Sequence, residues 1–440
     1  MTLDTASMFA AVRRALRDRD DLAAWSLRQI TSRGTQLYAV PAGVEARRSV
    51  TNERFVVDVL RQARGPADTP SCGAGNVTLL PGDDIGAALD AASLMAGLVH
   101  NPPHTIPAPA ELPEVATADP ELQVDPTAAL DRLYGQLRGA AAAEPRVRMT
   151  AAEFHAAEET VRLVNSRGID ASQTTTSVAA EWVLIAREGA REVESFVELT
   201  RRRAADLHLE VEVAHGVRQA VDLLTAGPAT AFAGPVILRG ATLGTFMNCG
   251  VIQTLSAAAS KFSKLSTWEI GQPVFRGEVS GDPLTVWANR RLPFGTHAAR
   301  FDDEGLPAQR VALIENGRLR AFTASQRYAD YLALPATGAF GDIEVAPGKT
   351  PAAELLAEPH VEIVTFSWFN PDEVTGDFAC EIRLGYRVEG GVRTPFRGGL
   401  LVGNVLDALA AARWSEETGF YGDYQGPTTA RFGHVTVAAA

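Results

Sequence analysis

The stretch "FACEIRLGYRV", residues 378–388, alternates apolar and charged side chains along most of its length. A period of two places every second side chain on the same face of an extended chain. One face carries the residues Phe378, Cys380, Ile382, Leu384, Tyr386 and Val388, and the other carries Glu381, Arg383 and Arg387. The pattern predicts a β-strand with its apolar face in a core and its charged face toward solvent.

Strand and turn signals surround this stretch from Val236 to the end of the chain. "ALIENGRLRAF", residues 312–322, predicts a hairpin because Asn316-Gly317 suits the positive φ angles of a tight turn. In "GNVLDALAAARW", residues 403–414, we place Asn404 as the N-cap of a helix that has Asp407 in its first turn. These signals predict a mostly antiparallel β domain with a few helices.

The first half alternates helical and extended patterns. An amphipathic helix near the N-terminus is followed by strand candidates at residues 24–40 and 54–62 and by helices at 83–100 and 127–143. A Pro-rich loop or linker fills residues 102–126, and residues 165–170 look like a turn. Residues 152–164 and 194–227 are predicted to be helical.

The change of pattern near Gly227 predicts a boundary between two domains. We expect an α+β protein with an N-terminal α/β two-layer domain, residues 1–227, and a C-terminal β-rich domain, residues 228–440.

Composition excludes several classes of protein. The chain of 440 residues has 41 Lys and Arg against 53 Asp and Glu, and a net charge of −12 disfavours nucleic acid as a partner. No uncharged apolar run reaches about 18 residues, so we expect neither a membrane span nor export. The cysteines Cys72, Cys249 and Cys380 lack the spacing of a metal knuckle or a disulfide framework. A bacterial cytoplasmic protein fits these features, since nearly all the basic residues are Arg, as in GC-rich genomes.

The usual catalytic patterns are weak. His100 and His104 have the spacing of two zinc ligands on a helix, but Pro102 and Pro103 between them exclude a helix. The acidic "FDDEG", residues 301–305, is interpreted as a solvated turn. Cys380 is interpreted as a buried thiol of the strand core. Residues alone therefore identify no active site.

A set of short segments resembles the TldD/PmbA family, in the same order along the chain. They are "NSRGID" (165–170), "FDDEG" (301–305), "IENGRL" (314–319), "VTGDF" (374–378), "GYRVEGG" (385–391) and "GNVLDAL" (403–409). The resemblance implies cytoplasmic metalloproteases of two subunits, often described as modulators of DNA gyrase. In them a TldD-type chain holds zinc through the histidines of an HExxxH helix and a cysteine near the C-terminus, and a TldE (PmbA)-type chain pairs with it. Such a zinc ion lowers the pKa of its bound water to about 7, and the glutamate takes the proton.

The segment at the place of the zinc helix is "GATLGTFMNCGVIQTLSAAASKFSKLSTWEIGQPVF", residues 240–275, and it contains no histidine. Its "IGQ" at residues 270–272 resembles the family's downstream segment. At the place of the family's cysteine stands "GFYGDYQG", residues 419–426, where Tyr421 is the matching residue. The resemblance therefore implies a TldE-type chain with no catalytic or metal-binding residue and no cofactor of its own.

We accordingly expect a non-catalytic subunit of a peptidase complex, with zinc in a TldD-type partner and an extended or unfolded peptide as substrate. Its role in proteolysis would include maturation of peptides or natural products. The heterodimer would form through the β-rich domain; a homodimer is the other possible assembly. Expected substrate-channel or interface residues are Gly250, Ser256, Thr375, Gly376, Asp377, Phe378, Gly403, Asn404 and Tyr421.

Two alternatives remain open from the sequence. One is a stand-alone homodimeric binding or scaffold protein. The other is an amidase-type hydrolase of a biosynthetic cluster whose active-site residues have been reassigned. A neighbouring gene that encodes HExxxH would favour the heterodimer over both.

Overall fold

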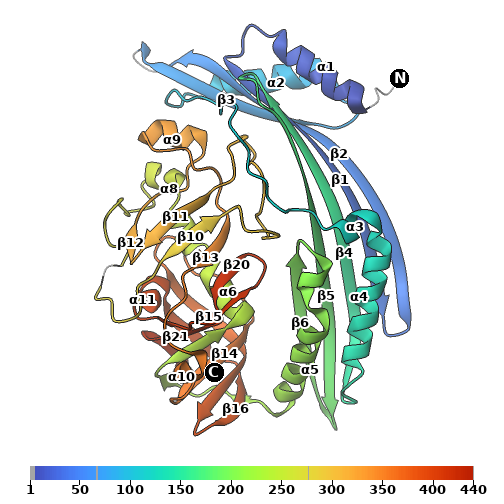
Figure 1. The fold of residues 1–440 in the computed structure, drawn as a ribbon, viewed down its shortest axis with the longest axis vertical. Coiled ribbons are helices and arrows are strands. Elements are labelled where there is room, and N and C mark those ends of the chain that lie inside the picture. Colours follow the sequence, from blue (N-terminus) through green and yellow to red (C-terminus); the bar gives the residue numbers. More distant parts are fainter. Residues whose placement is uncertain (1–4, 66–67, 276, 440) are drawn as a thin grey trace.

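The computed structural model describes residues 5–65, 68–275 and 277–439 and has an α+β fold of two domains, as predicted (Figure 1). In the first half the elements are α1 (Thr5–Arg17), β1 (Ala24–Val40), β2 (Gly43–Arg64), β3 (Pro70–Leu79), α2 (Ile85–Leu98), α3 (Pro120–Val124), α4 (Pro126–Ala141), β4 (Val147–Asn165), β5 (Asp170–Glu188), β6 (Arg191–Arg201), the 3₁₀ helix η2 (Ala204–Leu207) and α5 (Leu209–Thr225).

The second half contains many more short strands. Its elements are β7 (Gly227–Pro228), β8 (Phe232–Ala233), β9 (Val236–Arg239), α6 (Gly240–Met247), α7 (Val251–Leu255), α8 (Ala258–Phe262), β10 (Val286–Asn289), β11 (Arg310–Glu315), β12 (Arg318–Leu319), α9 (Gln326–Leu332), β13 (Asp342–Val345), α10 (Ala352–Leu355), β14 (His360–Phe366), β15 (Asp377–Glu389), β16 (Val392–Arg397), β17 (Leu400–Asn404), α11 (Val405–Ala410), β18 (Arg413–Trp414), β19 (Thr418–Phe420), β20 (Tyr424–Pro427), β21 (Thr429–Phe432) and β22 (Val435–Ala438).

A long, curved antiparallel sheet dominates the first half, with the strand order β3-β2-β1-β4-β5-β6. The predicted turn at residues 165–170 closes its β4–β5 hairpin. The Asn165 side-chain oxygen accepts the backbone N–H groups of Arg167 and Ile169, each at 3.0 Å, and Gly168 supplies a φ of 102°. The turn is thus confirmed, although it joins two strands rather than a helix and a strand.

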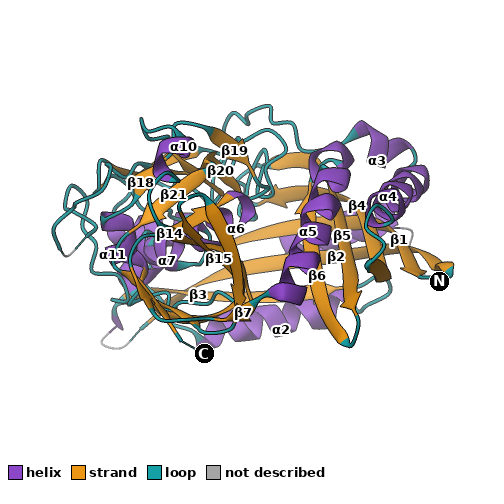
Figure 2. Cartoon of the chain, turned by 90° about the horizontal axis from the view of Figure 1, so that it is seen from below, coloured by secondary structure: helices purple, strands orange, loops and turns teal. Residues whose placement is uncertain are grey.

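Helices bury one face of this sheet in two clusters (Figure 2). Trp25 and Leu27 of β1 lie in a core with α1 and α2, whereas Leu37 and Ala39 further along the strand lie in a core with α4 and α5. All four are odd-numbered and share a face. The even-numbered Arg28 points the other way and pairs with Asp303 of the second half at 2.7 Å.

The predicted helix at residues 152–164 is wrong, because these residues belong to β4. Ala152, Phe154 and Ala156 are buried at every second position, which is the period of a strand. Alanine and glutamate are good helix formers, but intrinsic propensity is a small term, and pairing with β1 and β5 on both sides overrides it.

The predicted helix at residues 194–227 is correct only in its last part, α5. The segment first completes β6, which pairs with β5, and then forms η2. His208 separates η2 from α5, because its left-handed φ of 44° interrupts the helical conformation. The arginines and alanines of this segment are typical of a helix, so the sequence pattern did not predict the strand β6 or the turn after it.

Two sheets with strands from residues 227–438 build the second half. One has the order β12-β11-β10-β13-β20-β19, and the other runs β18-β21-β9-β14-β15-β17-β22-β8 with β16 and β7 at its side. The strand over residues 378–388 is confirmed as part of β15, with Phe378, Cys380 and Ile382 in the core. The predicted hairpin is confirmed as β11–β12, with φ values of 50° at Asn316 and 73° at Gly317.

α6 lies between these two sheets, in contact with β9, β14 and β21 on one side and β20 on the other. Leu243, Phe246 and Met247 are buried, and Phe246 packs against the rings of Phe378 and Phe432. The small-residue helix predicted within residues 240–275 is divided into α6, α7 and α8. α6 is therefore a core helix.

A segment of residues 99–119, here called the strap, contains no helix and contacts both halves of the molecule. Its Thr105 donates to Asp330 of α9, and Glu114 pairs with Arg300 at 2.8 Å. Toward the first half, Asn165 donates to the carbonyl of Pro107. The predicted Pro-rich loop is thus an ordered connection, and α3 and α4 begin at Pro120 and Pro126.

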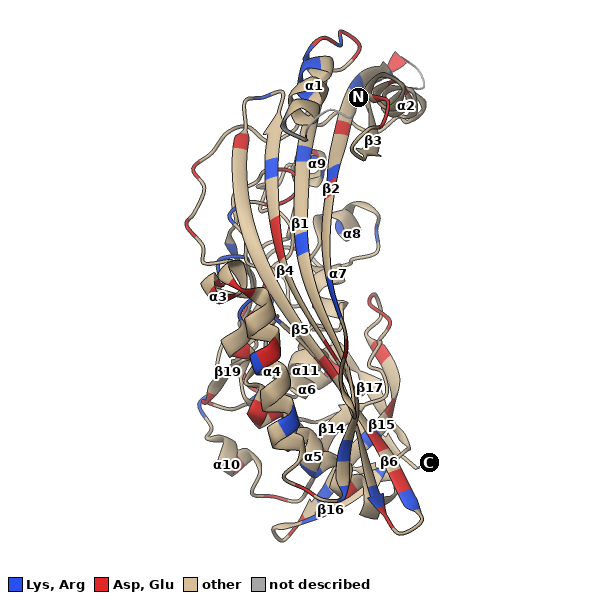
Figure 3. Cartoon of the chain, turned by 90° about the vertical axis from the view of Figure 1, so that its right-hand side faces the viewer, with Lys and Arg blue, Asp and Glu red and all other residues tan. Residues whose placement is uncertain are grey.

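Charged positions of both signs are scattered over the strands and helices (Figure 3). Among the described residues, no helix combines the length and the apolar character that crossing a bilayer requires.

Candidate functional site

The N-terminal end of α6 lies directly against the C-terminal segment that contains Tyr421. A Cβ atom placed on Gly240 would lie 3.5 Å from the Tyr421 ring, and one on Gly244 would lie 3.3 Å from the Tyr424 Cβ. The two tyrosine rings stack with centroids 6.2 Å apart and an angle of 19°. The fold therefore brings together the two segments at which the family resemblance places zinc ligands in a TldD-type chain, and the tyrosine rings lie against α6.

The residues at this place do not fit a zinc ion. The α6 sequence "GATLGTFM" offers no imidazole, thiolate or carboxylate. Burial raises the pKa of Tyr421, which keeps its phenol protonated. Cys249 just beyond α6 packs against the core, and burial raises its thiol pKa to about 11.

Six of the predicted site residues, Asn404 among them, lie together around the turn at residues 372–376 and the start of α11. The Asn404 amide donates to the Thr375 carbonyl and to the Asp377 carboxylate, both at 2.8 Å. Its oxygen accepts the N–H groups of Leu406 and Asp407, which confirms the predicted N-cap of α11. Gly403 pairs with Phe378 across the β15–β17 ladder, and Gly376 takes a φ of 83° beside Asn404. The arrangement holds the start of α11.

Gly250 lies close to this turn. It adopts a φ of 90°, and an added Cβ would come within 2.9 Å of three Glu373 side-chain atoms. Glu373 in turn accepts a hydrogen bond from Thr254 of α7 at 2.7 Å. Glycine suits this position because of the positive φ, and a larger residue would also displace the Glu373 side chain.

Ser256 and Phe378 lie inside the protein. Ser256 is 0% exposed, and its hydroxyl donates to the Ile252 carbonyl at 2.7 Å. Phe378 is 5% exposed in the aromatic cluster around α6. Their side chains support the core. The role of the predicted residues in a channel or an interface stays a prediction.

A buried polar cluster near Tyr421 was not predicted. Asp342 is 0% exposed; one oxygen accepts the His297 N–H at 3.0 Å, and the other has no hydrogen-bond partner among the described residues. Burial, together with the charge of Asp423, raises its pKa to about 7. The guanidinium of Arg202 donates to the backbone carbonyls of Gly295 and Thr296. These residues are far apart in sequence and form no motif, so only the fold reveals the cluster.

The interpretation of "FDDEG" as a solvated turn is wrong. Asp302 is 5% exposed and accepts the N–H groups of Glu304, Gly305 and Leu306, which closes the turn. Glu304 is half-buried and accepts the Gln326 N–H at 2.7 Å. Burial raises the pKa of Glu304 to about 7, because its effect exceeds the opposite effect of the Gln326 hydrogen bond. Only Asp303 of the three carboxylates faces solvent, with 88% of its side chain exposed.

The two histidines of the Pro-rich segment serve different contacts. His100 lies within 3.3 Å of the Ser71 hydroxyl, and His104 packs edge-on against Tyr331. Among the described residues, no group of three or more His, Cys, Asp and Glu side chains has the arrangement of a metal site.

Comparison with known proteins identifies the second half. Residues 233–439 match the PmbA/TldA metallopeptidase C-terminal domain. The C-terminal half of the chain belongs to the TldD/PmbA family. An uncharacterized protein of Methanocaldococcus jannaschii is 22% identical over 263 residues, which are 57% of this chain and 60% of that protein. The match thus spans less than two thirds of that relative.

Solved structures with the TldD/PmbA fold cover nearly the whole chain. TldE from Thermococcus kodakarensis superposes with a TM-score of 0.80 at 17% identity, over 98% of this chain and 99% of that one. A proposed modulator of a DNA gyrase from Thermotoga maritima gives a TM-score of 0.82 at 17% identity, over 98% and 100%. At such low identity these likenesses establish the fold, including that of the first half, which lies outside the family match.

Proposed function

We propose that this TldD/PmbA-family chain is the non-catalytic, TldE-like subunit of a heterodimeric zinc metallopeptidase that acts on extended or unfolded peptides. The observation that carries the proposal is the contact between α6 and the C-terminal segment. Where the resemblance implies zinc ligands in a TldD-type chain, Gly240 and Gly244 lie against the rings of Tyr421 and Tyr424. A hydrophobic contact of this kind supports a structural role for α6.

A partner of this chain would bind the β-rich half. Large apolar side chains are exposed there, with accessible fractions of 73% at Trp368, 65% at Val392, 40% at Leu400 and 38% at Val402. Leu400 and Val402 alternate along β17 and so share one face. Neighbouring exposed apolar side chains on one strand face favour association, and this face of β17 is where we place the partner. The partner we propose is a TldD-type chain with an HExxxH helix, in the bacterial cytoplasm.

The proposal is tested by mixing the purified chain with the TldD-type chain of the same genome. We expect a complex in analytical ultracentrifugation that cleaves unfolded casein, whereas neither chain cleaves it alone. A partner variant with Gln in place of the HExxxH glutamate should still bind this chain and lose cleavage. The proposal fails if this chain cleaves casein alone, or if the partner is fully active without it. Self-association that ignores the TldD-type chain would favour the homodimeric scaffold.

A further inference from the structure

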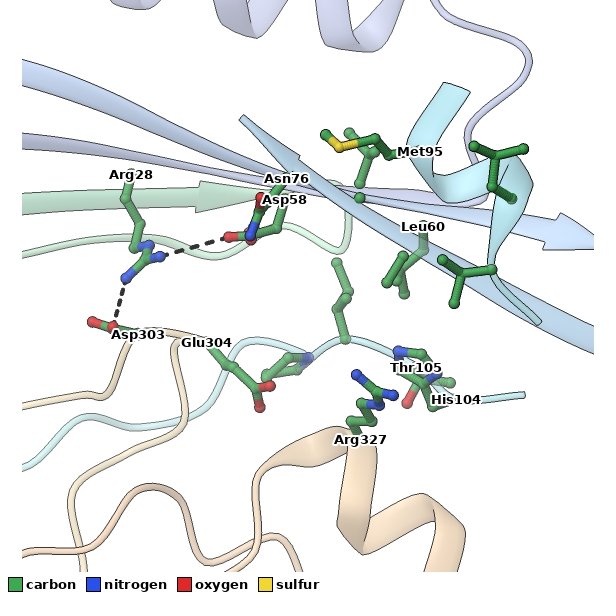
Figure 4. Close-up of a pocket in the computed structure, with 18 residues that line it drawn as sticks. Arg28, Asp58, Leu60, Asn76, Met95, His104, Thr105, Asp303, Glu304 and Arg327 are labelled. Atoms are coloured by element: carbon green, nitrogen blue, oxygen red, sulfur yellow. Dashed lines mark hydrogen bonds and ion pairs between the residues drawn. The ribbon is translucent and has the colours of Figure 1, made fainter. Parts of the chain in front are cut away.

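A cavity of about 680 Å³ lies between the two halves of the chain (Figure 4). Strands β1, β2 and β3, the end of α2 and the strap form its walls on one side, and the loop before β11 and α9 close the other. The volume is typical of sites for small ligands, which range from about 300 to 1,000 Å³. No residue of this cavity belongs to the α6 and Tyr421 region.

One wall of the cavity is apolar. Met95, Leu98 and Val99 at the end of α2 line it, with exposed fractions of 42%, 74% and 40%. Leu60 of β2 and Ile106 of the strap also line the cavity. Covering apolar side chains that remain this exposed beside a cavity with an apolar group lowers the free energy, which favours a ligand with an apolar part.

The two arginines of the cavity already have partners. Arg28 pairs with Asp303 at 2.7 Å and with Asp58 at 3.7 Å. Arg327 donates to Asn101 and to the Tyr331 hydroxyl, each at 3.0 Å, and its guanidinium lies over the Tyr331 ring. A further anion would compete with these contacts, so the arginines offer little to an anionic ligand.

The carboxylates Asp58 and Glu304 keep acceptor capacity. Asp58 lines the cavity and accepts a hydrogen bond from the Ser26 hydroxyl at 3.4 Å, and 45% of its side chain remains exposed. Glu304 uses one oxygen for the Gln326 N–H. A carboxylate can accept about four hydrogen bonds, so both groups can receive more donors.

The electrostatics of the two carboxylates also favour a cation. Burial raises the pKa of Asp58 and raises that of Glu304 to about 7, and the charge of Asp58 adds to the shift of Glu304. A positive group between them would stabilise both ionised forms and lower both pKa values.

We propose that the cavity binds an ammonium group carried on an apolar body, with Asp58 and Glu304 as acceptors and Met95, Leu98 and Val99 against the body. The inference rests on the cavity alone and is independent of the proposed peptidase complex. Two sources offer this chemistry: the N-terminus of a peptide with an apolar first residue, and a free alkyl or aryl amine.

The first test is calorimetry on the isolated chain with hexylamine and hexanol. Hexylamine, like lysine, keeps its proton up to about pH 10. We expect hexylamine to bind and hexanol to bind at least tenfold more weakly, because charge-assisted hydrogen bonds contribute about 1.5–3 kcal/mol. Equal binding of the two, or no binding of hexylamine, would overturn the proposal.

The sources are separated with Leu-Leu-amide and its N-acetylated form at pH 6.5. Binding of Leu-Leu-amide and not of the acetylated peptide assigns the cavity to peptide N-termini as well as to amines. Binding of hexylamine alone assigns it to small amines. Binding of the acetylated peptide as tightly as the free one overturns the role of the ammonium group.

Two variants of one helix give a matched comparison. Leu98→Lys places a positive charge, which repels the ammonium group of hexylamine, and a longer side chain at the apolar wall. Hexylamine binding should therefore weaken at least tenfold. Leu94→Lys is the control, since Leu94 is 65% exposed on the same helix and does not line the cavity. Both sites are exposed, so both variants should fold. Equal effects of the two would contradict the proposal.

The affinity should also depend on pH through Glu304. The charged and titratable groups that face it are Asp58 of β2, Arg28 of β1, His104 of the strap, Arg327 of α9 and Asp302 and Asp303 of its own loop. Ionisation of a carboxylate with a pKa of about 7 increases about tenfold from pH 6 to pH 8, and hexylamine affinity should follow it. Glu304→Gln should remove this dependence, and Glu315→Gln, on β11, should keep it. An unchanged pH profile in Glu304→Gln would exclude Glu304 as an acceptor.

Discussion

Ser256 has no free space around its side chain. The residue is 0% exposed, and its hydroxyl donates to the Ile252 carbonyl. Ser256→Trp should therefore destabilise the isolated chain, by about 1–3 kcal/mol or more, because overpacking forces neighbouring side chains out of their rotamers. Thermal unfolding measures the effect. Ser263→Trp, at an exposed position near the end of α8, should leave the melting temperature nearly unchanged. A stable Ser256→Trp variant would contradict the packing.

Asp342 should make stability depend on pH. Its folded-state pKa is about 7, above the value of about 3.9 in an unfolded chain, so the folded state binds the proton more tightly. The stabilisation is present below about pH 4 and is lost as the pH rises through about 7. We expect Asp342→Asn to flatten the decrease in unfolding free energy between pH 4 and pH 7, measured by urea denaturation.

The groups around Asp342 explain why asparagine is the replacement. His297 donates its N–H to the carboxylate, Asp423 raises its pKa, and Arg202 and Arg290 lower it. An asparagine can still accept from His297 through its oxygen. Asp90→Asn, on an exposed side chain of α2, is the control and should not change the slope. An equal slope in Asp342→Asn and in the unmodified chain would exclude this carboxylate as the cause.

At the scale of elements, the start of α11 depends on one amide. Asn404 caps the helix with its oxygen and holds Thr375 and Asp377 with its nitrogen. Asn404→Ala should cost about 1–2 kcal/mol, whereas Asn404→Ser, which keeps a capping oxygen, should cost less. Chemical denaturation of both variants measures the difference. Asp84→Ala, which removes the cap of α2, calibrates the cost of a cap alone. Equal losses in the two Asn404 variants would contradict a capping role.

Elements with a complete local signal could be predicted from the sequence. β15 alternates strictly, Asn316-Gly317 determines a tight turn, and Asn404 precedes an apolar helix. Residues 152–164 lack such a signal, because alanine and glutamate fit a helix and the strand arises only from pairing with β1 and β5. Local preference is decisive only where long-range pairing does not oppose it.

The same reasoning explains which parts of the sites could be predicted. The family resemblance matched α6 and Tyr421 to segments that hold zinc ligands in a TldD-type chain, and the structure brings the two into contact. Asp58 and Glu304 come from distant parts of the chain. Asp58 lies in no recognisable motif, and Glu304 belongs to the "FDDEG" segment, which was interpreted as a solvated turn. Their juxtaposition depends on how the two halves pack, which spacing along one chain does not encode.

At the scale of the whole molecule, the proposed function predicts the distribution of zinc. The isolated chain should hold no stoichiometric zinc by elemental analysis, since the residues of α6 and Tyr421 do not fit the ion. A chelator should leave its melting temperature unchanged and should abolish casein cleavage by the mixture with a TldD-type chain. One equivalent of tightly bound zinc in the isolated chain would contradict a TldE-like role.

The strap of residues 99–119 has a consequence for the chain as it leaves the ribosome. Its Thr105 and Glu114 bond to Asp330 and Arg300, which are synthesised much later. At about 5–20 residues per second, translation from the strap to Asp330 takes on the order of 10–40 s. During this interval the strap can satisfy only its contacts with the first half, such as Asn165 with Pro107. The nascent protein therefore passes through a stage at which its first sheet is complete while one edge of its future cavity still awaits the rest of the chain.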